Sequence, residues 1–392
     1  MKNLIFKLRS HFKKYNIDGY VVPKNDEFFS EYSNKDRLKK ISNFTGSAGY
    51  AVILKSKNYL FVDGRYTLQA KIQSGKNFKI IDYNKLFNCK IFRNLKLGID
   101  SSLFTKDQIK RFFSNNNIKL IKKNIIDEII KFKVKDQKFF YSLNQNIVGE
   151  SHKKKINKII NFLKKNKLDN IFITAPENVA WVLNIRGYDN PTSPIPNSNL
   201  VISRNKKKFI IASKKKLKKI IKEKKINSKE IIEPKNIKKF FNKLKGKNIS
   251  IDSKTCSIHY EEILNKKFNV IRNDDPIYLL KSIKNNTEIN NTIKAHINDG
   301  VALTKFIYWI KEVNKKKITE VDAQNKLEKF RKKNKNYLFP SFNTIAGSGK
   351  NGAIVHYRAT NKNKSYINKK DIFLCDSGGQ YKYGTTDVTR TI

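Results

Sequence analysis

The sequence predicts an α/β (α+β) protein with two similar α/β domains followed by a third region of different character. Three observations support this prediction. The first 280 residues contain the same order of elements twice, namely a helix, a strand that ends in proline, a glycine turn and a β-hairpin. From residue 283 apolar residues recur at helical spacing. From residue 338 glycine-rich loops and β-branched runs replace that helical pattern.

The first domain opens with a basic, amphipathic segment over residues 1–12 that predicts a helix. It lacks the continuous apolar run and the cleavage site of a signal peptide. A buried strand is expected over Asp18–Pro23, and the glycine turn Phe44–Ser47 comes next. A hairpin of strands Tyr50–Leu54 and Tyr59–Val62 completes the pattern.

The second domain repeats this order. A helix is expected over Ile156–Lys164, and a strand over Asp169–Ala175 ends at a proline. A second hairpin is expected from strands Leu200–Ser203 and Phe209–Ala212. Two α/β domains can also resemble each other by chance, and this alternative stays open. The expected domains are residues 1–136, 137–276 and 277–392.

The third domain begins with a predicted helix over Ile283–Val313, and a second helix follows Thr319 and extends to Phe330. Thr319 can cap the second helix, with Asp322 three residues later as the partner in a capping box.

The composition limits the function classes. The net charge of +50 suggests a nucleic-acid binder, but the lysines occur in short runs along the whole chain instead of one arm or stripe. A bias toward Lys, Asn and Ile codons explains them better, so no specific nucleic-acid partner is expected. The three cysteines are far apart and odd in number, which is typical of a reducing, cytoplasmic compartment. No segment has the roughly 20 apolar residues of a membrane span, so no membrane partner is expected.

The last seventeen residues are the most informative. A buried strand at Ile372–Leu374 leads to a glycine turn, and Thr385–Thr391 predicts a returning strand. Such a hairpin can place Asp376 and Asp387 side by side. Paired carboxylates suit hard divalent cations, and two neighbouring ions can activate a bridging water. Spacing alone favours the simpler interpretation, in which Asp376 caps a turn and Asp387 is an ordinary surface residue.

The segment DSGGQYKYGTTDVTRT, from Asp376 to Thr391, resembles the metal-binding hairpin of the pita-bread metallopeptidases, specifically their cytosolic Xaa-Pro aminopeptidase branch. Further similar segments occur in order: FVDGRYTLQA from Phe61, AWVLNIRGYDNP from Ala180 and FPSFNTIAGSGKNGAIVHYRAT from Phe339. The resemblance spans essentially the whole chain. It implies two creatinase-like α/β N-terminal domains and a pita-bread catalytic domain.

The resemblance also implies roles for single residues. Asp376 matches the carboxylate that binds one metal ion, and Asp387 matches the one that bridges both. His356 matches a histidine that contacts the substrate near the scissile bond, and Arg65 matches an arginine that reaches toward bound substrate. The implied cofactors are two divalent ions, with manganese as the usual metal. The implied partners are peptides with proline at the second position and a second copy of the chain in a homodimer.

One departure from the family pattern matters for activity. The remaining three of the five expected metal ligands, one histidine and two glutamates, follow the hairpin in the family, whereas this sequence ends at Ile392. The catalytic domain is therefore expected to be incomplete, with no complete catalytic set and little or no activity. The main hypothesis is an Xaa-Pro aminopeptidase. The alternatives are a prolidase-like dipeptidase and a non-catalytic binding or scaffold protein of the same fold.

Overall fold

The computed structural model describes residues 2–32, 35–87, 89–132, 138–312 and 317–392. They form two compact units, each described by itself below. The first unit comprises Met1–Ser142, His152–Asn190 and Ile195–Ser282, and the second comprises Leu143–Ser151, Pro191–Pro194 and Ile283–Ile392. The predicted boundary at residue 136 lies outside the described residues. Both domain boundaries stay predictions.

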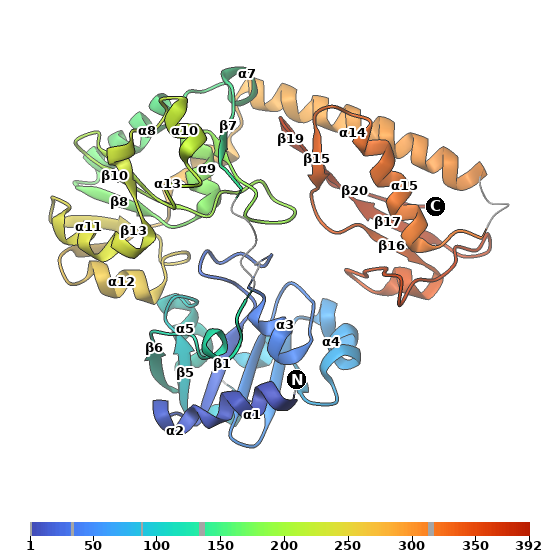
Figure 1. Ribbon diagram of the computed structural model, residues 1–392, viewed down its shortest axis with the longest axis horizontal. Coiled ribbons are helices and arrows are strands. Elements are labelled where there is room, and N and C mark those ends of the chain that lie inside the picture. Colours follow the sequence, from blue (N-terminus) through green and yellow to red (C-terminus); the bar gives the residue numbers. More distant parts are fainter. Residues whose placement is uncertain (1, 33–34, 88, 133–137, 313–316) are drawn as a thin grey trace. The chain divides into compact units, whose positions relative to one another are not determined.

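The first unit contains a six-stranded mixed sheet in the order β4-β3-β2-β1-β5-β6 (Figure 1). The central strands β1, β2 and β3 are antiparallel, and the remaining neighbours pair in parallel. The strands are β1 (Gly19–Pro23), β2 (Tyr50–Leu54), β3 (Asn58–Val62), β4 (Lys79–Asp82), β5 (Lys96–Asp100) and β6 (Asn117–Ile121). The helices are α1 (Lys2–Ser10), α2 (Phe12–Tyr15), α3 (Arg37–Ser42), α4 (Thr67–Ser74), α5 (Lys106–Phe113) and α6 (Ile125–Ile129).

A second six-stranded sheet in the same unit has the order β12-β11-β10-β8-β13-β14. Its strands are β8 (Asn170–Ile173), β10 (Asn199–Ser203), β11 (Lys208–Ile211), β12 (Ile231–Ile232), β13 (Asn248–Ile251) and β14 (Asn269–Arg272). The accompanying helices are α8 (His152–Lys165), α9 (Pro176–Leu183), α10 (Lys218–Lys222), α11 (Ile237–Lys243), α12 (Ile258–Leu264) and α13 (Pro276–Ser282). A small ladder joins β7 (Tyr141–Ser142) to β9 (Ile185–Arg186).

The two sheets share one topology. In each, an antiparallel three-stranded centre carries one parallel strand on one side and two on the other. Each strand pair predicted as a hairpin is a hairpin, β2–β3 in the first sheet and β10–β11 in the second. The internal repeat and the α/β class predicted from the sequence are therefore confirmed. The inner strands of both sheets are buried and are nearly continuous apolar runs, as in β1 and β10, whereas the edge strands β4, β6, β12 and β14 are partly exposed.

The second unit contains two long helices, α14 and α15, and two three-stranded sheets, in the orders β15-β18-β19 and β16-β17-β20 (Figure 1). Its helices are α7 (Gln145–Val148), α14 (Asn286–Glu312) and α15 (Glu320–Lys332). Its strands are β15 (Tyr337–Pro340), β16 (Ile345–Ser348), β17 (Phe373–Ser377), β18 (Gly379–Tyr381), β19 (Gly384–Thr385) and β20 (Val388–Thr391). Helix α15 begins with the predicted capping box, because Thr319 and Asp322 each accept a hydrogen bond from the other's backbone N–H.

Helix α14 is confirmed, but its buried face is not the row of apolar residues on which the prediction depended, namely Ile289, Ile293, Ile297, Val301, Ile307 and Ile310. The first four residues of that row are 42–63% exposed. The buried positions are Ala295, Asp299, Ala302, Leu303, Phe306 and Ile310, of which only Ile310 belongs to the row. The buried face includes two alanines and an aspartate, so a search for large apolar residues overlooked it.

The predicted continuous strand Thr385–Thr391 is wrong in one respect. The structure breaks it into β19 and β20, which belong to different sheets. The break falls at Thr386 and Asp387. Buried Thr386 causes it, because its backbone N–H and its hydroxyl oxygen turn back to hydrogen-bond Gly379.

Candidate metal centre and substrate-contact residues

Strand β17 carries the first candidate ligand and presents two different faces. Phe373 and Cys375 are buried in the apolar cluster formed with α14 and α15. Burial raises the pKa of the Cys375 thiol to about 11, which keeps it protonated and unsuited to binding a metal. Leu374 and Asp376 alternate with them and lie on the opposite face. The half-buried carboxylate of Asp376 therefore points away from the helices.

The strand register places Asp376 beside the strand that Asp387 leads into. Asp376 lies opposite Thr389 of β20, and the Thr389 hydroxyl donates to its Oδ1 at 2.8 Å. Asp387 lies just outside this ladder, directly before Val388, the first residue of β20. That the two carboxylates lie side by side stays a prediction. Asp387 is exposed to solvent.

The position of Asp387 depends on the interruption between strands β19 and β20, at Thr386. Ser341 Oγ donates to the carbonyl of Thr386 at 2.9 Å, and Gly379 N–H donates to the Thr386 hydroxyl at 2.9 Å. The same carbonyl passes so close to Gly378 that a Cβ there would lie 2.0 Å from its oxygen. Glycine at position 378 is therefore a steric requirement of the hairpin, in addition to a turn signal.

His356 lies in the segment that follows the 3₁₀ helix η6 (Gly349–Ala353). It is half-buried and has a backbone φ of 59°, in the left-handed region that non-glycine residues rarely adopt. Its neighbour Tyr357 packs with Ile345, and Leu374 packs against the same cluster. Ile345 pairs directly with Asp376. The His356 segment thus lies over the sheet face that carries Asp376.

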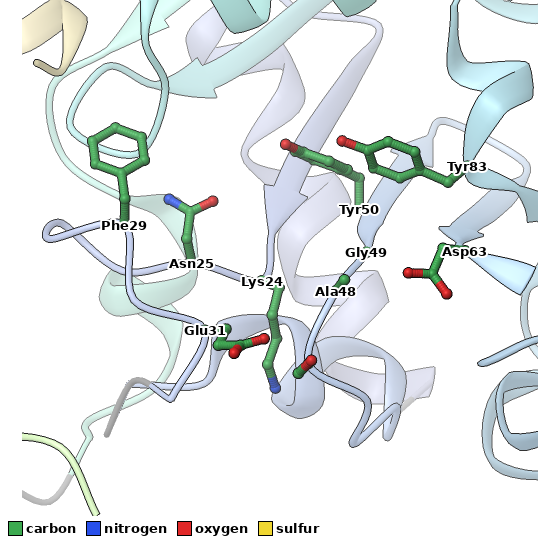
Figure 2. A pocket seen from close by; sticks show the side chains of 10 residues that line it. Lys24, Asn25, Phe29, Glu31, Ala48, Gly49, Tyr50, Asp63 and Tyr83 are labelled. Carbon is green, nitrogen blue, oxygen red and sulfur yellow. The ribbon is translucent and has the colours of Figure 1, made fainter. Parts of the chain in front are cut away.

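Arg65 belongs to the first unit, in the 3₁₀ helix η1 (Gly64–Tyr66) directly after β3. Its guanidinium binds Asp63, with Nη2 2.6 Å from Oδ2, and this hydrogen bond raises the pKa of Arg65. Asp63 lines a cavity of about 350 Å³ that Glu31 and Tyr50 also line. Figure 2 shows the phenol rings of Tyr50 and Tyr83 next to each other in this cavity, with centroids 5.8 Å apart.

Sequence reasoning missed a buried ion pair directly behind Asp376. The Arg331 guanidinium binds the Asp299 carboxylate through two contacts, Nε to Oδ1 at 2.7 Å and Nη2 to Oδ2 at 3.0 Å. Arg331 also donates to the hydroxyl of Ser377 at 3.0 Å. The signal was present, because Asp299 is in helical phase with buried Ala295, Ala302 and Phe306. An aspartate on a buried helix face requires a partner.

The donors fit a divalent cation in kind but not in number. Asp376 and Asp387 offer carboxylate oxygens, which are the ligands that hard cations prefer. Across the parts of the chain that the structure describes, no group of three or more His, Cys, Asp or Glu side chains could hold a metal ion. Those same residues include no helix long and apolar enough to cross a bilayer.

Comparison with known families accounts for each part of the fold. Residues 5–122 and residues 131–288 each match the creatinase/prolidase N-terminal domain, by two separate family models. Residues 290–392 match metallopeptidase family M24.

Several relatives match nearly the whole chain. The probable Xaa-Pro aminopeptidase P of Laccaria bicolor is 32% identical over 98% of this chain, which spans 63% of that relative's length. A probable Xaa-Pro aminopeptidase P of Paracoccidioides brasiliensis is 32% identical, with 98% of this chain and 68% of the relative covered. Xaa-Pro aminopeptidase 1 of Dictyostelium discoideum is 33% identical over 98% and 66%.

A solved structure agrees. The X-prolyl aminopeptidase of Caenorhabditis elegans, described as a cytosolic enzyme with a di-nuclear active site, matches with a TM-score of 0.91 at 26% identity. The match covers all of this chain and 69% of that one. The two creatinase-type domains, the metallopeptidase domain and these identities together confirm the resemblance seen in the motifs. The chain belongs to the Xaa-Pro aminopeptidase family of M24 metallopeptidases.

Proposed function

We propose that this chain forms part of a metal-dependent aminopeptidase that removes the N-terminal residue from peptides with proline at the second position. The observation that carries the proposal is the arrangement around β17. Asp376 lies in β17, Asp387 directly precedes the paired strand β20, and the segment with His356 packs on the sheet face of Asp376. Relatives that match 96–98% of the chain at 32–33% identity are named as enzymes of this specificity.

In this proposal each residue has a distinct role. Asp376 contributes oxygen ligands to one of two divalent ions, for which we propose Mn²⁺, and Asp387 contributes oxygens to both. The Thr389 hydroxyl holds Asp376 Oδ1 and so orients the other oxygen for a metal. His356 donates a hydrogen bond to the scissile carbonyl as negative charge develops on its oxygen. Bound metal ions supply an activated water and polarise that carbonyl. Arg65 contacts the bound peptide farther from the scissile bond.

We further propose that the protein acts in the cytoplasm as a homodimer. The cytoplasmic assignment is supported by Cys89, Cys256 and Cys375, which are all free thiols. A prolidase-like dipeptidase is the alternative with the same chemistry. The aminopeptidase is favoured because both creatinase-type domains are present. In addition, the relatives that match nearly the whole of this chain are named as aminopeptidases.

Titration of the chain with Mn²⁺ tests the metal assignment. We expect weak binding that falls at least about tenfold in D376N and in D387N, because each substitution removes an anionic ligand. D371N is the matched control, since Asp371 is an exposed aspartate just before β17. Equal affinity of all four proteins for Mn²⁺ contradicts the assignment of these ligands.

Hydrolysis tests the activity. Peptides with proline or alanine at the second position are incubated with the 392-residue chain and Mn²⁺. Because the described residues hold only part of a metal site, we expect little or no turnover. Robust cleavage that survives D376N would show that the site lies elsewhere. Mn²⁺ binding that depends on Asp376, without peptide binding of any kind, would instead support a non-catalytic scaffold.

A further inference from the structure

The carboxylate of Glu320 is the centre of a hydrogen-bonded cluster that the site description has not used. Glu320 is the first residue of α15 and is fully buried. Its Oε1 accepts from the backbone N–H of Ser348 at 2.8 Å and from the Asn351 side-chain amide at 2.9 Å. Its Oε2 accepts from the Tyr357 hydroxyl at 2.9 Å and from the backbone N–H of Ser365 at 2.8 Å.

Three N–H donors and the Tyr357 hydroxyl surround this carboxylate, which has about four lone-pair positions. The hydroxyl has one proton, which it shares between Glu320 Oε2 and the carbonyl oxygen of Asn363. Every donor is a neutral group, so the negative charge is held by hydrogen bonds at the positive end of helix α15. Breaking these hydrogen bonds would leave a buried anion without partners, which costs free energy. The groups that donate to the carboxylate are therefore held firmly in place.

All four donors come from one segment, residues 348–365, which enters the cluster at Ser348 and leaves it at Ser365. Tyr357 is the central member, because its hydroxyl also lies 2.7 Å from the carbonyl oxygen of Asn363. Burial and the neighbouring Glu320 raise the pKa of Tyr357, which keeps this hydroxyl a donor at neutral pH. Backbone contacts also join the start of α15 to the end of this segment. Thr319 forms an isolated β-bridge with Tyr366, and Glu320 N–H donates to the carbonyl of Ser365.

His356 lies inside this segment, one residue before Tyr357. Its backbone φ of 59° is unfavourable for a histidine and persists only where the surroundings enforce it. The bonds from Ser348, Asn351, Tyr357 and Ser365 to one carboxylate supply that constraint on both sides of His356. We propose that Glu320 is the positioning residue that holds His356 over the metal-binding face of β17. The functional part of this inference rests on the role proposed for His356.

Helix α15 supplies a matched control. Glu328 lies on the same helix and also accepts a tyrosine hydroxyl, from Tyr337 at 2.6 Å, but Tyr337 belongs to β15 and not to the His356 segment. E320Q and Y357F are therefore compared with E328Q and Y337F. Each pair removes the same chemical groups, namely a carboxylate of α15 and the tyrosine hydroxyl that this carboxylate accepts. Glutamine retains one acceptor oxygen but places an NH₂ against donors, so E320Q loses about half of the bonds.

The first measurement is hydrogen exchange of the full chain, which requires no catalysis. We expect exchange across residues 344–368 to become at least tenfold faster in E320Q, with a smaller effect in Y357F. Exchange in α14 and β17 should stay unchanged, which shows that the unit remains folded. E328Q and Y337F should match the wild type in the His356 segment. Equal exchange in E320Q and wild type would overturn the inference.

The second measurement follows the imidazole resonances of His356, assigned with H356N, while Ala-Pro-Ala or Ala-Ala-Ala is added with Mn²⁺. A purely structural role for Glu320 predicts no change in this response. We expect the proline peptide to shift the resonances in wild type and E328Q, and the shift to be lost in E320Q. An unchanged shift in E320Q would overturn the positioning role. If wild type itself gives no shift, the role proposed for His356 fails, whatever hydrogen exchange shows for Glu320.

Discussion

The buried pair of Arg331 and Asp299 allows a quantitative prediction about the second unit. Both side chains are at most 2% exposed, and two hydrogen bonds join them. In R331M a chain of similar length and no charge replaces the guanidinium. Among the residues that the structure describes, Asp299 then keeps the Tyr381 hydroxyl, which donates to its Oδ1 at 2.9 Å. Ser377, the neighbour of Asp376, loses its contact with Arg331.

The expected loss in the free energy of unfolding is about 3–5 kcal/mol, because removing one partner leaves an uncompensated buried charge. With a urea m-value of about 2 kcal/mol/M, this lowers the unfolding midpoint by roughly 2 M. A double variant with D299N removes that charge too. Its loss should be smaller than the sum of the two single losses, since the two residues act as one unit.

Tryptophan fluorescence can isolate this unit. The chain has two tryptophans, Trp181 in the first unit and Trp309 in α14, so a W181F background leaves Trp309 as the reporter. The control is K332M on the adjacent residue, an exposed lysine whose nearest acidic group is Glu328 at 3.5 Å. Such surface pairs contribute at most about 1 kcal/mol. A midpoint for R331M within 0.5 M of that for K332M, roughly the resolution of such a comparison, would refute the reasoning.

Two further predictions concern the hairpin and the first unit. In G378A the added Cβ meets a backbone carbonyl at 2.0 Å, so we expect a loss of about 1–3 kcal/mol by urea titration together with weaker Mn²⁺ binding. The control is G300A in α14, where nothing lies within 4 Å of the added Cβ. This substitution should be neutral or should stabilise the protein by up to about 1 kcal/mol. Equal losses of stability in G378A and G300A would contradict the steric argument. Burial raises the pKa of Asp275 to about 6, above its value in the unfolded chain. The native state therefore binds the proton more tightly than the unfolded state does. The stability that protonated Asp275 contributes is lost as pH rises from about 4 to 6. Relative to wild type, D275N should therefore become more stable by up to about 3 kcal/mol over this range, as read from Trp181 fluorescence, and parallel pH profiles of the two proteins would count against it.

Most of the secondary structure could be predicted because its signals are local. The strands of both hairpins, α8 and the capping box of α15 each depend on alternation, helical spacing or a cap within a few residues. The repeat was visible for the same reason, since two copies of one local pattern can be compared without knowing how either folds. The chemical identity of Asp376, Asp387 and His356 as candidates came from motif resemblance, not from spacing.

Tertiary structure decided which faces are buried and which side chains meet. Helical phase groups Asp299 with Ala295, Ala302 and Phe306, but it did not identify the partner, because Arg331 lies 32 residues away along the chain. Nor could it show that Thr386 divides the returning strand, because the partner Gly379 is brought back by a turn.

The sequence by itself determined the α/β class and the duplicated N-terminal domains, because these depend on local periodicity. Its motifs, through their resemblance to a known family, also named the candidate residues for binding metal and substrate. Only the folded chain decided that one sheet face collects Asp376 and the His356 segment, and that Glu320 binds that segment at four points. Both features join positions far apart in sequence, and such contacts arise from packing and from the satisfaction of buried polar groups.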